Sequence, residues 1–292
     1  MGLGTWQRRT GPIVLSVKVN IWQFVPMSLS RGKLVAGLTA TTLAAAFLVR
    51  RSYALSSSMP KYTLHVYDHC PFCIRVELLC GIFGINYDRV VYGYGEGAPA
   101  EKHGYGDGPV KLTGKKMLPV LEGPGVPKPS NMVGMPESLD ICSYLIAHHK
   151  LNVPCATGRL DKWKQRFNPV KSKLSRPRII KVPVKDWEKE EDVAYAKQKY
   201  EGNGFNYEAA LAETPALLDE MNKLLLELDG FLDGDESIYS WGLSMEDITL
   251  LPDMKTLSVV DGIVWPPKVR KWIDAAYGKC ASQMELYDNY KC

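Results

Sequence analysis

The sequence lacks a second pair of closely spaced cysteines. Among its seven cysteines, only Cys70 and Cys73 stand three positions apart, and the others are scattered along the chain. A structural zinc site needs four ligands at set spacings, and the adjacent His148 and His149 do not complete such a set. We therefore expect no metal in this chain, since an iron–sulfur cluster would need ligands from a second chain.

Acidic side chains are absent from residues 1–60, the leader, which holds seven basic residues. The whole chain has 36 basic and 32 acidic residues, so the remainder carries 29 basic and 32 acidic residues, a formal charge of −3. The basic residues of the leader are dispersed, which argues against nucleic-acid binding. An acid-free leader with arginine and serine is typical of a transit peptide, and it favours delivery to a mitochondrion or plastid.

One long uncharged run lies within the leader, from Leu34 to Val49, between Lys33 and the pair Arg50-Arg51. Its sixteen residues fall short of the roughly 20 that cross a bilayer comfortably, although flanking basic side chains can reach the membrane surface. The run fits either a retained single-pass membrane anchor or part of a cleaved targeting segment. Two arginines directly after it favour the anchor slightly.

The paired cysteines form the motif Cys70-Pro71-Phe72-Cys73, which follows a strand-like run over 61–67. Proline suits the first helical position, so the motif places Cys70 at a helix N-terminus. There the helix dipole and free N–H groups favour the thiolate and lower a cysteine pKa into the range of roughly 3.5 to 7.5. A thiolate with a second thiol in reach is a centre for thiol–disulfide exchange, which we favour over a structural disulfide.

The residues after the motif predict a βαβ unit. Ile74, Leu78 and Ile82 form one apolar stripe that neighbouring residues broaden, so we expect a helix buried on much of its circumference and ended by Gly84. The run 87–92 then predicts a second strand, parallel to the first.

Five blocks of sequence, in order, resemble the two-domain glutaredoxins of the glutaredoxin 2 type: Tyr67–Cys73, Leu118–Leu121, Met135–Ile141, Leu243–Ile248 and Gly262–Pro266. The resemblance runs from about 61 to about 277. It implies an α/β thioredoxin-like N-terminal domain and an all-α C-terminal domain like that of glutathione transferases. We assign the leader to 1–60, the thioredoxin-like domain to 61–150 and the helical domain to 158–292, with the boundary near Pro154 and Gly158.

The resemblance also implies roles for single residues. Cys70 would be the nucleophile and Cys73 the resolving thiol. Pro119 would be a cis-proline, and Leu118 before it would offer its backbone to glutathione, the expected cofactor. A cis X–Pro bond is a deliberate feature, because trans is preferred by about 0.5 to 1 kcal/mol.

Glu137 and Ser138 match the position at which this superfamily binds the γ-glutamyl end of glutathione. Ser138 also falls where a new helix starts, and a helix N-terminus with a hydroxyl suits a carboxylate. The alternative is a plain helix cap with an acidic residue beside it. His69 is also expected among the glutathione-binding residues. His69 and Arg75 would help to hold Cys70 as a thiolate, or they are surface residues.

The sequence departs from the family pattern near the motif and after the second strand. Phe72 stands where a tyrosine is usual, which removes a hydroxyl beside the active site. Residues 93–108 are rich in glycine, and because no strand-to-helix fingerprint frames them, we expect a flexible loop rather than a phosphate site.

Beyond residue 157 the pattern predicts helices over 162–167, 185–199, 209–228 and 248–260. The charged stretch 185–199 is interpreted as a solvated helix face. Ser244 and Asp247 have the spacing of a capping box, which fixes the start of the last of these helices.

The sequence thus predicts a glutathione-dependent thiol–disulfide oxidoreductase that acts on disulfide-bearing or glutathionylated proteins. Two alternatives stay open. One is an enzyme like the membrane-associated prostaglandin E synthase type 2, which the downstream blocks fit less well. The other is a non-catalytic accessory subunit of an organellar membrane complex, against which the intact Cys70 and Cys73 argue.

Overall fold

The computed structural model describes residues 61–280 and 284–292 of the chain. All the described residues belong to one compact unit, within Met59–Cys292. The leader, with its apolar run over 34–49, lies outside the described residues. Among the residues that are described, no helix combines the length and apolarity needed to cross a membrane.

A four-stranded sheet in the order β2-β1-β3-β4 forms the centre of the N-terminal part. Strand β1 (Tyr62–Val66) pairs in parallel with β2 (Tyr87–Val91), and it pairs antiparallel with β3 (Val120–Glu122), which pairs with β4 (Met135–Pro136). The parallel pair is joined by helix α2 (Pro71–Phe83), which Gly84 ends in the left-handed conformation with φ 64°. The predicted βαβ unit is therefore confirmed.

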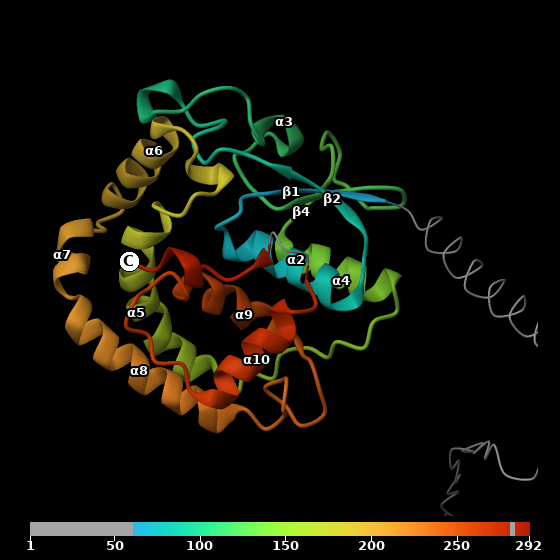
Figure 1. Cartoon of the computed structure of the whole chain (residues 1–292). Helices are drawn as coiled ribbons and strands as arrows, with labels where there is room; N and C mark the ends of the chain where they lie inside the picture. The colour runs from blue at the N-terminus through green and yellow to red at the C-terminus, as the bar shows by residue number, and fades with distance from the viewer. Residues whose placement is uncertain (1–60, 281–283) are drawn as a thin grey trace, which may run out of the picture. The chain divides into compact units, whose positions relative to one another are not determined.

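Two helices pack beneath the sheet in Figure 1, α2 and α4 (Ser138–His148). Between β2 and β3 the chain forms the short helices η1 (Ala100–Lys102) and α3 (Val110–Thr113). Together these elements form the thioredoxin-like region expected from the sequence.

The rest of the chain is helical. The helices are α5 (Asp161–Ile179), η2 (Lys185–Trp187), α6 (Glu190–Glu201), α7 (Tyr207–Ala212), α8 (Thr214–Phe231), α9 (Met245–Leu257), α10 (Pro267–Tyr277) and η4 (Asp288–Tyr290). The predicted capping box begins α9, since the Ser244 hydroxyl accepts the N–H of Asp247 and the Asp247 carboxylate accepts the N–H of Ser244.

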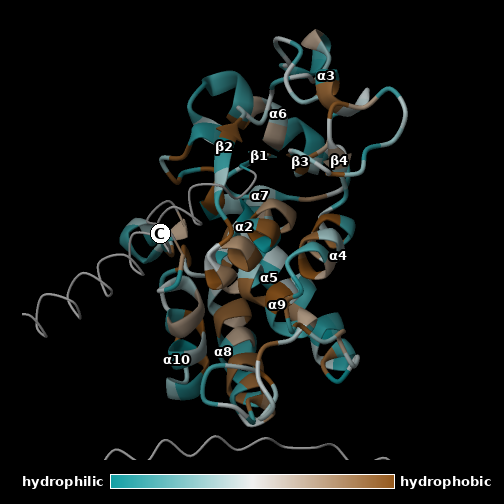
Figure 2. Ribbon diagram, turned by 90° about the vertical axis from the view of Figure 1, so that its right-hand side faces the viewer, coloured by the Kyte–Doolittle hydropathy of each residue, from teal (hydrophilic) through white to brown (hydrophobic). Residues whose placement is uncertain are grey.

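Helix α2 packs against α4 on one side and against α9 and α10 of the helical region on the other. Its residues Ile74, Val76, Leu78 and Leu79 are all fully buried, which confirms the expectation that little of this helix meets solvent. Figure 2 shows hydrophobic residues gathered where α2, α5 and α9 meet. One continuous apolar core therefore joins the two regions, and the helical region contacts the helix that begins at the motif.

All four predicted helices differ from the observed ones in their bounds. The one predicted over 248–260 forms as α9 but begins and ends three residues earlier. The helix predicted over 162–167 continues to Ile179, and the one over 209–228 is split at Glu213, because Pro215 has no N–H with which to continue an α-helical ladder. The stretch 185–199 forms η2 and part of α6. It is not simply a solvated face, because Asp186 and Asp192 within it are fully buried.

The glycine-rich segment 93–108 is packed against α6, so the expectation of a flexible loop was wrong. Asp192 accepts hydrogen bonds from the N–H of Gly95 at 2.7 Å and from the hydroxyl of Tyr105 at 2.9 Å. A Cβ atom at Gly93 would lie 2.1 Å from the Tyr105 hydroxyl. Glycine is needed there because the backbone approaches a neighbouring side chain closely.

Candidate active site

Cys70 is the N-cap residue of α2, with Pro71 in the first turn, as the motif predicts. Cys70 is a partly exposed residue, and its carbonyl accepts the N–H of Ile74 at 2.9 Å. The hydrogen bond from the Cys73 thiol, the electrostatic effect of His69 and the N–H groups of Cys73 and Phe72 lower the pKa of Cys70 to about 6. Near neutral pH the attacking sulfur is therefore mostly thiolate.

Cys73 lies one turn further along α2 and is fully buried. Its sulfur accepts a hydrogen bond from the N–H of Tyr67 at 3.4 Å, yet burial raises its pKa well above the usual range. The two cysteines thus differ in kind, because one is an accessible thiolate and the other a buried thiol. Both are free in this structure.

His69 precedes the nucleophile and is buried, so the prediction that it is a surface residue is excluded. Its imidazole Nδ1 is hydrogen-bonded to the carboxylate of Asp186, which is fully buried in η2 of the helical region. The same carboxylate accepts the backbone N–H groups of Asp68 at 2.8 Å and of His69 at 2.7 Å. Asp186 therefore holds the backbone on which Cys70 stands.

Sequence reasoning missed Asp186, because it lies inside a charged stretch that looks solvated. One signal was available, since Trp187 follows directly and a tryptophan is seldom fully solvated. In the structure Trp187 packs on His69, with ring centroids 4.4 Å apart. Helix η2 thus contacts the loop before Cys70 with both residues.

The Leu118–Pro119 peptide bond is cis, which confirms that expectation. Leu118 and Pro119 line a small pocket of about 140 Å³ together with Phe72, Met117, Glu137 and Ser138. The structure thus brings four of the five predicted glutathione-binding residues to one pocket beside the motif, whereas the fifth, His69, lines the larger pocket described below. Their roles in binding stay predictions.

Glu137 and Ser138 form the junction between β4 and α4. Glu137 has φ 69° and ψ 111°, a conformation that non-glycine residues rarely adopt and that is often found at functional sites. Ser138 is the first residue of α4 and is buried. Its hydroxyl accepts a hydrogen bond from the Arg75 guanidinium at 2.8 Å, so Arg75 supports the small pocket rather than facing freely into solvent.

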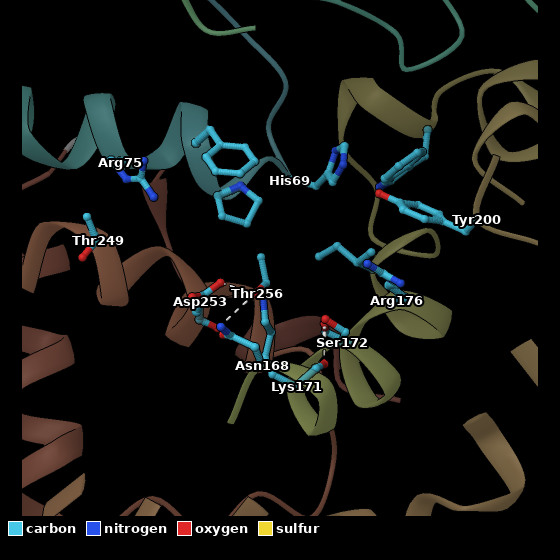
Figure 3. Close-up of a pocket in the computed structure, with 15 residues that line it drawn as sticks. His69, Arg75, Asn168, Lys171, Ser172, Arg176, Tyr200, Thr249, Asp253 and Thr256 are labelled. Atoms are coloured by element: carbon cyan, nitrogen blue, oxygen red, sulfur yellow. Dashed lines mark hydrogen bonds and ion pairs between the residues drawn. The ribbon is translucent and has the colours of Figure 1, made fainter. Parts of the chain in front are cut away.

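A larger pocket, of about 410 Å³, lies on the other side of Phe72 and is drawn in Figure 3. Its walls come from α2, α5 and α9, with His69, Trp187 and Tyr200 at one end. Among the described residues, no group of three His, Cys, Asp or Glu side chains could hold a metal ion. The motif therefore borders two pockets of different size, since Phe72 lines both of them.

A buried charge cluster lies behind α2. Arg89 of β2 forms ion pairs with Asp68 and with Glu77, whose side chains are mostly buried. Burial raises the pKa of Glu77, and burial lowers the pKa of Lys255 to about 8. The main-chain carbonyl of Asp68 also accepts the hydroxyl of Tyr287 at 3.1 Å. Lys255 of α9 and Tyr287 of the C-terminal segment thus lie close to Asp68, two residues before Cys70.

A thioredoxin-like sheet with a paired-cysteine helix, a cis-proline and an attached all-helical region defines a two-domain protein with the architecture of glutathione transferases. A family profile described as "Glutaredoxin 2, C terminal domain" matches residues 159–290. The chain is 27% identical over 220 residues to glutaredoxin 2 of Escherichia coli strain K12, an alignment that covers 72% of this chain and 92% of that protein. The chain is therefore similar to glutaredoxin 2 over most of that protein's length, and its helical region matches the C-terminal profile of that family.

The fold agrees with a solved relative. The crystal structure of glutaredoxin 2 from Salmonella typhimurium, in complex with glutathione, superposes with a TM-score of 0.68 at 24% identity. The superposition covers 79% of this chain and 99% of that one. The thioredoxin-like and helical regions are therefore arranged as in a two-domain glutaredoxin.

Proposed function

We propose that the chain is a glutathione-dependent thiol–disulfide oxidoreductase that reduces mixed disulfides of glutathione with proteins. The single observation that carries the proposal is the pairing of a partly exposed Cys70, whose pKa is lowered to about 6, with the buried Cys73. The similarity to glutaredoxin 2 and the cis-proline pocket support it. A role as an idle subunit would leave this pairing without a purpose.

The reaction runs by thiol–disulfide exchange. The Cys70 thiolate attacks the glutathione sulfur of the mixed disulfide, the protein thiol leaves as a thiolate and takes up a proton, and glutathione stays bound to Cys70. A second glutathione thiolate then attacks this new disulfide, which releases glutathione disulfide and restores the Cys70 thiolate. Alternatively Cys73, once deprotonated, displaces the glutathione and forms a Cys70–Cys73 disulfide that two glutathione molecules reduce.

Trapping tests this chemistry directly. The full-length Cys73→Ser variant, treated with glutathione disulfide, should accumulate one glutathione on Cys70, because the internal resolving thiol has been removed. Peptide mapping by mass spectrometry identifies the modified residue. Modification spread over the exposed Cys155 and Cys292, with none at Cys70, would overturn the proposal.

Membrane delivery is the second part of the proposal and rests on the leader. Its acid-free composition and the apolar run 34–49 support targeting to an organelle, with the apolar run kept as a membrane tether. After alkaline carbonate washing, a tethered chain stays in the membrane pellet with its N-terminus before Leu34. A soluble mature chain that begins at or beyond Ser56 would contradict the tether.

A further inference from the structure

The larger pocket beside Phe72 carries an excess of positive charge. Arg75, Lys171 and Arg176 line it, and Asp253 is the single carboxylate among its lining residues. Lys171 and Asp253 form an ion pair at 2.7 Å. The guanidinium groups of Arg75 and Arg176 are therefore left without a carboxylate partner among the residues that line the pocket. Figure 3 shows Arg75 on α2 and Arg176 on α5, on different walls of the pocket.

Arg176 has no carboxylate partner among residues 61–280 and 284–292. Its guanidinium lies over the ring of Tyr200, 4.6 Å from the centroid, and over that of Phe205 at 5.2 Å. Stacking of this kind fixes the plane of the guanidinium while its N–H edge stays available for a carboxylate. The side chain is therefore held in place without being neutralised.

Arg75 offers a second donor. One of its terminal nitrogens donates to Ser138, but its Nε is buried and has no hydrogen-bond partner in the described part of the chain. The guanidinium still carries a positive charge at the wall of the pocket. Both arginines therefore favour an anionic group there.

The mixed disulfide has two halves, and the small pocket of about 140 Å³ leaves no room for both. The half that is released from glutathione must lie elsewhere beside the motif, and the larger pocket shares Phe72 with the small one. Its volume of about 410 Å³ is in the range of sites that hold small molecules or a few side chains.

We propose that Arg176 is a specificity-determining residue that selects mixed disulfides whose released half carries a carboxylate next to the sulfur. This inference rests on the proposed function. A carboxylate next to the sulfur can belong to a small acidic thiol or to an acidic peptide, and both present the same chemistry to Arg176. In the exchange step the bond between the two sulfurs breaks, and the released thiolate takes its proton from solvent.

The test compares glutathionylated peptides that differ only in the residue beside the cysteine, which is Glu, Gln or Lys. For the full-length chain, kcat/KM should be about 10-fold higher with Glu than with Gln, the effect of one charge-assisted hydrogen bond. It should be lower again with Lys. A parallel pair of small mixed disulfides, made from mercaptoacetate and from 2-mercaptoethanol, shows whether small acids are selected as well. A preference for the acidic member, in the peptides or in the small mixed disulfides, supports the inference. It also shows whether acidic peptides or small acidic thiols are selected.

Two variants assign the preference to its residue. Arg176→Gln should make kcat/KM equal for the Glu and Gln peptides. Arg176→Lys should keep part of the preference for Glu. The matched control is Arg166→Gln on the same helix, because Arg166 is exposed and paired with Glu227, and it should keep the full preference.

The outcomes separate this inference from the proposed function. Equal kcat/KM values for the Glu, Gln and Lys peptides and for the small pair, with turnover present, would overturn the role of Arg176 and leave the oxidoreductase intact. Absence of turnover on every disulfide would overturn both. The wild-type chain alone can overturn the inference if it shows no preference, whatever the folding of the variants. A preference that Arg176→Gln keeps in full would also overturn the role of Arg176.

Discussion

The thioredoxin-like region and the helical region contribute different things to the active site. The first supplies the reactive pair Cys70 and Cys73 and the cis-proline, all within short stretches of sequence. The second supplies Asp186, which contacts His69 across 117 positions of the chain, and most of the wall of the larger pocket. The thioredoxin-like region therefore holds the cysteine pair, and the helical region holds the loop before Cys70 in place and forms most of the larger pocket.

The largest expected effect tests the first half of that comparison. Cys70→Ser should lower glutathione-coupled reduction to the uncatalysed rate, because the other thiol of the motif, Cys73, is fully buried and cannot replace it. Cys73→Ser should keep at least about a tenth of the wild-type rate on glutathionylated substrates, because external glutathione can resolve the intermediate. The rates are measured by a coupled reduction assay. Cys155→Ser, which removes an exposed thiol, is the control. Equal losses for Cys70→Ser and Cys73→Ser would contradict the single-thiol route.

The second prediction tests the contribution of the helical region. Asp186→Asn should lower the free energy of unfolding by about 1 to 3 kcal/mol, because the buried charge that receives three hydrogen bonds is lost. It should also slow the reaction of Cys70, since the loop before it loses its support. Urea unfolding and single-turnover kinetics measure the two effects.

The control for Asp186 is Asp235→Asn. Asp235 is exposed and pairs only at the surface with Lys271, so its replacement should change stability by less than about 0.5 kcal/mol. If Asp186→Asn and Asp235→Asn behaved alike, the helical region would not position the active-site loop.

The third prediction concerns the small pocket. Ser138→Ala and Glu137→Gln should each weaken glutathione binding by about 1 to 3 kcal/mol, the usual loss for a charge-assisted hydrogen bond. Titration calorimetry gives the affinities. Ser143→Ala is the matched control, because Ser143 lies on the same helix but is exposed and donates only to the carbonyl of Leu139. Unchanged glutathione affinity in these two variants would show that Glu137 and Ser138 serve only to begin helix α4.

The smallest effect is a shift in pH dependence. Alkylation of reduced Cys70 by iodoacetamide should rise with pH to a midpoint of about 6 and then level off, because the thiolate is the reactive form. Cys73→Ala should move the midpoint upward, since the hydrogen bond from Cys73 is the largest cause of the lowered pKa. Cys73→Ser retains a donor and should move it less. A midpoint near the ordinary cysteine value of about 8.5 in the wild-type chain would contradict the assignment.

Signals confined to a few neighbouring residues predicted the structure correctly. The strand before Cys70, the helix after it, its end at Gly84 and the capping box at Ser244 all formed as expected. The helix start, its end at Gly84 and the capping box depend on hydrogen bonds or steric preferences within one turn, which the local sequence determines. The strand is marked by its residue types, although its pairing partners lie far along the chain. Glu137 and Ser138 were likewise found beside Pro119, although that expectation came from family resemblance.

Burial of charge could not be predicted in this way. Asp186 and Asp192 lie in a stretch that looks like any exposed charged helix, and only the folded chain brings backbone N–H groups to them. The glycine-rich segment was misjudged for the same reason, because its role is to approach Asp192 closely.

The sequence by itself determined that Cys70 begins a helix, because a proline after it suits the first helical position, where the Cys73 thiol, the dipole and the N–H groups of Phe72 and Cys73 lower the pKa of its thiol. Only the tertiary structure decided how that thiol is held and what it faces. The support from Asp186, the buried state of Cys73 and the positive charge of the larger pocket all arise from contacts between distant segments. Such contacts form only once the apolar core has joined the two regions. Hydrogen bonds and charges then contribute more to the free energy than they would in water, because they are buried.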